Sequence, residues 1–156
     1  MKYEVGVINY GIGNIKSIAN ILQKIGANFV VITNPNEVNN CKSLILPGVG
    51  SFNQAMNNIK ALGIDEAIHN AHKKNSKILG ICLGMHLLAT KGLEYGETDG
   101  LNLISNTIRL FDKTKMANLK IPHIGFNSVE KSEKGKLFYD LNNLSDFYFV
   151  HSYIMT

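Results

Sequence analysis

The sequence predicts an α/β fold in which a mostly parallel central sheet has helices on both faces and carries an antiparallel extension. Strand-like and helix-like segments alternate as far as Ile81, which is the pattern of right-handed βαβ crossovers. Beyond residue 100 the segments are strand-like with little helix between them, as expected for an antiparallel extension. The 156 residues, 45% hydrophobic and 18% charged, contain no linker or repeat and predict a single globular domain, residues 1–156.

The elements follow from residue periodicity and from the turn residues between them. Strands are expected at Tyr3–Ile8, Phe29–Ile32, Ser43–Leu46, Lys77–Ile81, Leu101–Phe111, Ile121–Val129 and Phe147–Ile154. Helices are expected from Ile15 to a stop at Gly26, at about Phe52–Leu62, at Ile64–Asn75, and from about Leu83. Ligands of open α/β sheets bind outside the carboxyl ends of the strands, so the segments after these ends are the places to look for chemistry.

Composition excludes several classes of protein. The basic residues behind the net charge of +4 are scattered along the chain, which argues against a nucleic-acid partner. No apolar run approaches the ~18–20 residues of a membrane span, and no signal peptide opens the chain, so we expect a cytoplasmic protein with no membrane partner. Cys41 and Cys82 form neither a metal-spaced pair nor a disulfide framework, and we expect no metal.

Gly80-Ile81-Cys82-Leu83-Gly84 is the most informative segment. A G-x-C-x-G at a strand-to-helix junction is the cysteine form of the nucleophile elbow, in which small residues permit a sharp turn. The helix that begins near Leu83 places unpaired N–H groups beside the sulfur, which favours the thiolate and supplies a donor for an oxyanion. Cys82 is therefore the candidate nucleophile. The competing interpretation is a structural cysteine packed between two glycines. Cys41 has no such context, and we expect it to be an inert, small apolar residue.

Two glycine-rich turns follow other predicted strands. The backbone of Pro47-Gly48-Val49-Gly50 should lie beside the elbow, where it can direct a second N–H group at an oxyanion. Asn9–Asn14 contains G-x-G, but Lys16 stands where the dinucleotide fingerprint requires its third glycine. We therefore expect no nucleotide and no other cofactor.

The chain resembles the class I, triad-type glutamine amidotransferases, which have a flavodoxin-like fold. Within that family it is most similar to the glutaminase subunits of imidazole glycerol phosphate synthase. The matching segments, in the family's order, are Asn9–Asn14, Leu46–Phe52, Leu79–Met85, Pro122–Asn127 and Phe149–Tyr153. Each is weak alone, but together they are specific and span nearly the whole chain.

The resemblance implies that Cys82 attacks the side-chain amide of glutamine, releasing ammonia and leaving a glutamyl thioester that water hydrolyses. It implies an oxyanion hole formed by N–H groups of Val49, Gly50 and Leu83. It also implies a synthase (cyclase) subunit as partner in a heterodimer, which would use the ammonia in histidine biosynthesis. The implied glutamine-binding residues are Gly50, His86, Glu94, His151, Ser152 and Tyr153.

The sequence departs from the family at its end. Family members continue to a His-Pro-Glu segment that supplies the base and its orienting carboxylate, whereas this sequence stops at Thr156 and none of its five histidines precedes Pro-Glu. General base catalysis is usually worth about 10²–10⁴-fold, so we expect little glutaminase activity from these 156 residues and interpret the chain as C-terminally truncated.

Three further positions differ from the family. His86 stands where Gln is usual, and the alternatives are a tolerated substitution or a substitute partner for Cys82 one helical turn away. Phe126 replaces a usual Trp and Asn9 a usual Asp, which leaves open an amidotransferase that supplies ammonia for surface-polysaccharide amino sugars. A catalytically impaired binding subunit and another Cys-elbow fold are the remaining alternatives.

Overall fold

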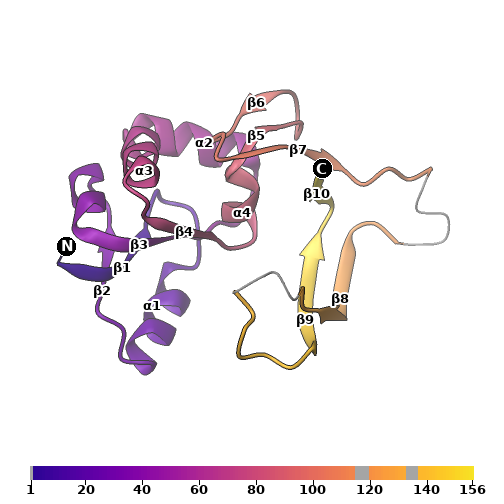
Figure 1. Ribbon diagram of the computed structural model, residues 1–156. Helices are drawn as coiled ribbons and strands as arrows, with labels where there is room; N and C mark the ends of the chain where they lie inside the picture. The colour runs from indigo at the N-terminus through magenta and orange to yellow at the C-terminus, as the bar shows by residue number, and fades with distance from the viewer. Residues whose placement is uncertain (1, 115–119, 133–136) are drawn as a thin grey trace. The chain divides into compact units, whose positions relative to one another are not determined.

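The computed structural model describes residues 2–114, 120–132 and 137–156. It divides into two compact units, which are considered separately (Figure 1). The first unit comprises Met1–Arg109 with Met155–Thr156, and the second comprises Leu110–Ile154. The expectation of a single domain stays a prediction.

A four-stranded parallel sheet forms the centre of the first unit. Its strands are β1 (Tyr3–Ile8), β2 (Phe29–Ile32), β3 (Cys41–Leu46) and β4 (Lys77–Gly80), in the order β2-β1-β3-β4. All three pairings are parallel, which confirms the predicted sheet. The order reverses between β1 and β3, and in open α/β sheets ligands bind at such a switch point. The turns that follow β1 and β3 flank it.

Helices cover both faces of this sheet, as predicted. They are α1 (Ile15–Lys24), the 3₁₀ helix η1 (Pro35–Asn40), α2 (Phe52–Ala61), α3 (Ile64–Lys73) and α4 (Leu83–Leu87). Figure 1 shows α1 on one side of the sheet and α3 on the other. No helix in the described part of the chain is both long enough and apolar enough to cross a membrane.

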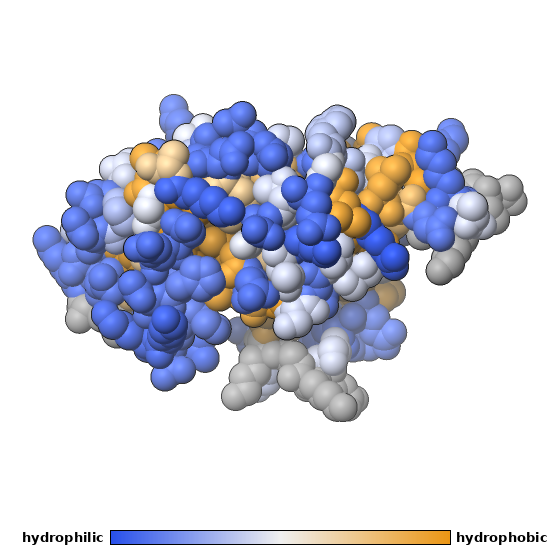
Figure 2. All heavy atoms as spheres, turned by 90° about the horizontal axis from the view of Figure 1, so that it is seen from above, coloured by the Kyte–Doolittle hydropathy of each residue, from blue (hydrophilic) through white to orange (hydrophobic). Residues whose placement is uncertain are grey.

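Amphipathic packing holds α2 and α3 in place. Their inward faces are buried and consist of Phe52, Ala55, Met56, Ile59, Ile64, Ala67, Ile68 and Ala71. Their outward faces carry asparagines, lysines and histidines, and Figure 2 shows the corresponding surface as largely hydrophilic. The apolar residues at the end of α1 are less covered: Leu22 is buried, but Ile21 and Ile25 are 62% and 69% exposed.

A second sheet of the first unit contains a parallel pairing that the sequence did not predict. Strand β5 (Ala89–Gly92) pairs antiparallel with β6 (Thr98–Asp99) but parallel with β7 (Ile104–Leu110). The hairpin through β6 turns the chain back, so β7 runs again in the direction of β5. Thr107 and Thr156 exchange two backbone hydrogen bonds beside β7.

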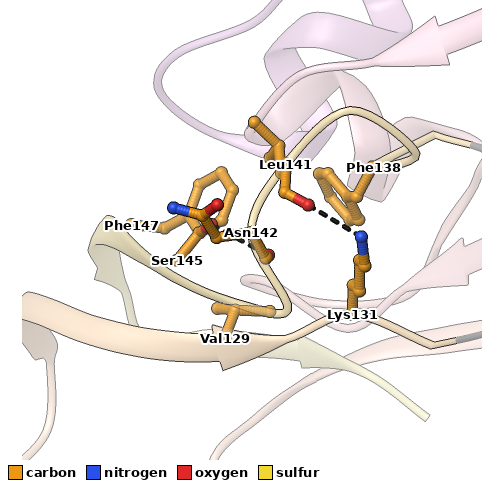
Figure 3. Close-up of a pocket in the computed structure, with 7 residues that line it drawn as sticks. All are labelled: Val129, Lys131, Phe138, Leu141, Asn142, Ser145 and Phe147. Atoms are coloured by element: carbon orange, nitrogen blue, oxygen red, sulfur yellow. Dashed lines mark hydrogen bonds between the residues drawn. The ribbon is translucent and has the colours of Figure 1, made fainter.

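The second unit is built on an antiparallel hairpin of β8 (His123–Glu130) and β9 (Leu144–His151). The last predicted strand is interrupted at Ser152, after which β10 covers Tyr153–Met155. Residues 137–143, which precede β9, fold back onto the hairpin, where the Lys131 ammonium donates to the carbonyl of Leu141 at 2.7 Å (Figure 3). The pocket beneath this contact encloses only about 10 Å³, which is too small for a substrate.

Candidate active site

Cys82 occupies a strained turn between β4 and α4. Its backbone has φ 54° and ψ −120°, a conformation that residues with a side chain rarely adopt, and its side chain is exposed. Such a backbone conformation costs about 1–3 kcal/mol and persists only where the surrounding structure enforces it. A strained, exposed residue directly after a strand and before a helix is the geometry of a nucleophile elbow.

The two glycines of the elbow are required by close backbone contacts. A Cβ on Gly80 would lie 2.5 Å from the Cα of Met85, and a Cβ on Gly84 would overlap the carbonyl oxygen of Leu46. Neither neighbour is a flexible side-chain end that could move away. The expectation that small residues permit the sharp turn is confirmed, with a specific neighbour for each glycine.

The segment Pro47–Gly50 lies beside the elbow, as expected from its place after a neighbouring strand. Leu46 pairs with Gly80 in the register of β3 and β4, and the Ile81 N–H donates to the Leu46 carbonyl at 3.0 Å. A Cβ on Gly48 would lie 2.9 Å from the amide nitrogen of Gly84. The turn after β3 therefore approaches the first turn of α4 closely at Gly48, which has no side chain to hold the two apart.

The turn after β3 and the start of α4 contain backbone N–H groups with no acceptor among the described residues. Within the described residues, the backbone N–H groups of Val49, Gly50 and Leu83 donate to no other group of the protein. Gly50 has φ +91° and Val49 is 52% exposed, so this part of the turn faces solvent. Leu83 is the first residue of α4, where N–H groups have no partner within the helix. The oxyanion-hole role that the sequence analysis gave these three N–H groups stays a prediction.

Glu94 anchors the end of this turn. Its Oε2 accepts a 2.7 Å hydrogen bond from the N–H of Phe52, the first residue of α2. A carboxylate at a helix N-terminus satisfies an unpaired donor and interacts favourably with the helix dipole. The sequence placed Glu94 among the glutamine-binding residues, and that role stays a prediction. The contact with α2 was not foreseen.

Tyr10 is a residue that the sequence interpretation missed. It is 1% exposed in the turn after β1, and its hydroxyl donates to the carbonyl of Pro47 at 2.7 Å. Burial raises the pKa of this hydroxyl, and the nearby Cys82 sulfur raises it further. The hydroxyl therefore stays protonated around neutral pH. Asn9–Asn14 was considered in the sequence analysis for its glycines. No local pattern in the sequence predicts that Tyr10 contacts Pro47, which is 37 positions away.

The remaining candidate residues lie in the second unit. His151, Ser152 and Tyr153 are each half-buried at the end of β9 and the start of β10. The Nδ1 of His151 is 2.9 Å from the Tyr153 carbonyl, so it must carry a proton, and its Nε2 can accept from the Nδ1 of His123 at 3.0 Å. His123 was not among the predicted site residues, although it lies in a matching motif.

His86 and Cys41 are the last two residues that the sequence analysis discussed. His86 is half-buried on α4, and its backbone N–H donates to the Cys82 carbonyl at 3.4 Å. Cys41 is buried, and burial followed by the charge of Glu37 raises the pKa of its thiol. In the described ranges, no three His, Cys, Asp or Glu side chains are grouped so that they could hold a metal ion.

Comparisons with known proteins give the chain a family context. Residues 6–156 match the family described as "Glutamine amidotransferase class-I". "Imidazole glycerol phosphate synthase subunit HisH 1" of Campylobacter jejuni (strain 81-176) is 43% identical over 150 residues, covering 96% of this chain and 74% of the relative. "Imidazole glycerol phosphate synthase subunit HisH 2" of Methanococcus maripaludis is 43% identical over 152 residues, covering 96% and 73%.

Solved structures share the fold at lower identity. A crystal structure described as that of a glutamine amidotransferase superposes with a TM-score of 0.71 at 18% identity, covering 94% of this chain and 70% of the other. A glutamine amidotransferase from Thermotoga maritima gives a TM-score of 0.64 at 17% identity, covering 100% and 63%. At such identity the likeness supports the fold, and it agrees with the predicted α/β class.

Replacing Gly84 with Ala should destabilise the protein. Ala is favoured over Gly in a helix by about 1 kcal/mol, but overpacking of a well-packed core costs about 1–3 kcal/mol, and here the obstacle is a backbone oxygen. We expect a net loss in the free energy of unfolding, measured by urea denaturation. The control is Met85→Ala, at an exposed side chain of the same helix, with an expected change within about 0.5 kcal/mol. An unchanged midpoint for Gly84→Ala would contradict the close approach.

The two thiols should differ sharply in reactivity. Iodoacetamide should alkylate the exposed Cys82 in the folded protein, while Cys41 should react only after unfolding because its thiol is buried and its raised pKa lowers the thiolate fraction. Intact mass counts the adducts, and peptide masses after digestion identify the modified residue. Cys82→Ser should remove the fast reaction and Cys41→Ser should leave it. Equal rates at both thiols in the native state would contradict the assigned burial.

Proposed function

This chain belongs to the class I glutamine amidotransferase family, and from that membership we propose that Cys82 hydrolyses glutamine to glutamate and ammonia for an imidazole glycerol phosphate synthase of histidine biosynthesis. The enzyme type and pathway follow the relatives, and the surface-polysaccharide and binding-subunit alternatives are not favoured by them. The observation that carries the residue assignment is the strained turn at Cys82 with unused N–H groups beside it. A cytoplasmic location stays part of the proposal.

In the proposed reaction the Cys82 sulfur attacks the side-chain carbonyl carbon of glutamine. The carbonyl π electrons move to the oxygen, and their return expels the amide nitrogen, which takes up the proton that the Cys82 thiol has lost and leaves as ammonia. Water then attacks the glutamyl thioester, releasing glutamate and restoring the thiol. The strained backbone of Cys82 supports this role, since it holds the sulfur clear of the sheet.

Backbone N–H groups stabilise the tetrahedral intermediate in this proposal. Leu83 supplies one from the first turn of α4, and Val49 and Gly50 supply others from the turn after β3. Loss of one such donor in other acyl-transfer enzymes costs about 10²–10³-fold in kcat. The support is that none of these N–H groups donates to another group among the described residues, together with the close contact between the two turns.

Glutamine recognition is assigned by resemblance to two groups of residues. Gly50, His86 and Glu94 come from the first unit, and His151-Ser152-Tyr153 come from the second. Glu94 already accepts one hydrogen bond within the protein, so its contribution to glutamine binding would have to come through its remaining acceptor capacity. No cofactor or metal is needed for the proposed chemistry.

Proton transfer is not assigned to a residue in this sequence. The family draws its base from a His-Pro-Glu segment, and none of the five histidines in the 156 residues precedes Pro-Glu. The proposed partner is the cyclase subunit of the synthase, which would receive ammonia directly. An experiment on this function must therefore separate formation of the thioester from turnover.

Cys82→Ser should abolish covalent capture of a glutamine analogue. We expect 6-diazo-5-oxo-L-norleucine to form one adduct on the wild-type chain, detected by intact mass and assigned by peptide mapping to Cys82. Glutamine itself should compete with the analogue, because both occupy the same site. Release of ammonia from glutamine, measured with glutamate dehydrogenase and with a cyclase subunit present, then reports turnover.

Cys41→Ser is the matched control, since it removes the other thiol and should leave adduct formation unchanged. Reaction of the analogue at both cysteines, or labelling that glutamine does not slow, would contradict a glutamine site at Cys82. Capture without ammonia release would support the nucleophile and locate the deficit in proton transfer.

His86→Gln should strengthen glutamine binding. The family usually has Gln at this position, and an added neutral hydrogen bond contributes about 0.5–1.5 kcal/mol, or roughly two- to tenfold in affinity. We expect the glutamine concentration that halves the rate of analogue capture to fall by that factor. If His86 were instead a base for Cys82, capture by His86→Gln would slow severely at saturating analogue.

A further inference from the structure

We propose that Tyr10 is a positioning residue for the proposed oxyanion hole, because its hydroxyl fixes the peptide that leads into the N–H groups of Val49 and Gly50. The inference rests on the proposed function and deepens it. Tyr10 does not touch the substrate in this proposal. It acts through the backbone of the turn that follows β3.

Tyr10 is held at both ends. Its backbone carbonyl accepts a hydrogen bond from the Asn58 side chain of α2 at 3.1 Å, and its hydroxyl donates to the Pro47 carbonyl at 2.7 Å. The ring between these contacts is fully buried. A side chain fixed in this way defines the position of its hydroxyl, and therefore of the carbonyl that accepts from it.

The hydroxyl completes a series of contacts along the start of the turn. The Leu46 carbonyl accepts from the Ile81 N–H, and the next carbonyl, that of Pro47, accepts from Tyr10. Pro47 has no N–H and a restricted φ, so these two hydrogen bonds set the direction in which the chain enters Gly48. The N–H groups of Val49 and Gly50 follow directly.

Gly48 shows how closely the hydroxyl approaches the turn. A Cβ at this position would lie 2.6 Å from the Tyr10 hydroxyl oxygen and 3.0 Å from the Leu83 Cβ. The turn is thus held between Tyr10 on one side and the first residues of α4 on the other. At its far end, Glu94 holds the N–H of Phe52. The free N–H groups lie between two anchored ends.

The hydroxyl is also suited to a permanent donor role. Burial raises the pKa of Tyr10 well above its usual value, and the charge of the Cys82 sulfur acts in the same direction. A thiolate at Cys82 therefore makes loss of the Tyr10 proton still less favourable. The hydrogen bond to Pro47 persists when the nucleophile is charged.

The test is Tyr10→Phe, which keeps the ring and removes the donor. The buried Pro47 carbonyl then lacks its partner, and the peptide can rotate toward another donor, which misdirects the N–H groups that follow. Acyl transfer is read with γ-glutamyl p-nitroanilide, whose leaving group depends less on a proton donor than ammonia does. We expect release of p-nitroaniline at saturating substrate to fall about tenfold or more, with the half-saturating concentration nearly unchanged.

Two further readouts separate positioning from loss of stability. Alkylation of Cys82 by iodoacetamide needs no oxyanion donor, so its rate should stay within about twofold of wild type. In backbone amide NMR spectra, the resonances of Gly48, Val49 and Gly50 should shift strongly. Ile68→Val is the control, since it shortens a fully buried side chain of α3 and should move neither the acyl-transfer rate nor these resonances. All variants are assayed below their unfolding transitions.

An unchanged acyl-transfer rate in folded Tyr10→Phe would overturn the proposal, as would unchanged amide resonances of the turn. A parallel fall in alkylation and acyl transfer would also overturn it, because that result indicates a general disturbance of Cys82. If the wild-type chain releases no p-nitroaniline, that result contradicts the proposed acyl transfer at Cys82 and not the role of Tyr10. The NMR comparison then decides whether Tyr10 orients the turn.

Discussion

The contact between the ends of β3 and β4 is the constraint on which the candidate active site depends. The Leu46 carbonyl accepts from the Ile81 N–H while Gly84 packs against the same carbonyl without a side chain. This double contact brings the turn after β3 to the first turn of α4. It therefore sets the separation between Cys82 after one strand end and the turn that contains Val49 and Gly50 after the other. Any side chain at Gly84 would force the two strand ends apart.

Strain at Cys82 is maintained by packing on either side of it. The turn places a residue with a side chain at φ 54°, and α4 holds it there because Leu83 and Leu87 are buried. Helix α4 has only five residues, and the N–H groups of Gly84 and Met85 in its first turn already donate to the Ile81 and Cys82 carbonyls, which leaves the N–H of Leu83 next to Cys82. The neighbouring turn is anchored by side chains from distant parts of the chain. A site assembled in this way owes its geometry to backbone contacts, so substitutions that add atoms to glycine are more damaging than those that remove surface side chains.

The second unit is organised by side-chain contacts between its two strands. His151 is held by a chain of ring hydrogen bonds to His123 and to the Tyr153 carbonyl, and the His123 ring stacks on Phe149 with centroids 4.9 Å apart. These contacts fix which nitrogen of His151 carries its proton. The segment assigned to glutamine recognition by resemblance is therefore organised within its own hairpin, by side chains that lie opposite one another in the β8–β9 register.

Local features of the sequence determined much of this protein. The bounds of β1 and β2 agree with their predicted ranges, the alternation of elements predicted a parallel sheet, and G-x-C-x-G identified the turn at Cys82. These features depend on the periodicity and size of neighbouring residues. Tertiary structure alone decided that β7 runs parallel to β5, that Tyr10 meets Pro47 across 37 residues, and that Glu94 meets Phe52 across 42. Contacts over such separations arise from packing of the whole unit, and no local pattern of residues encodes them.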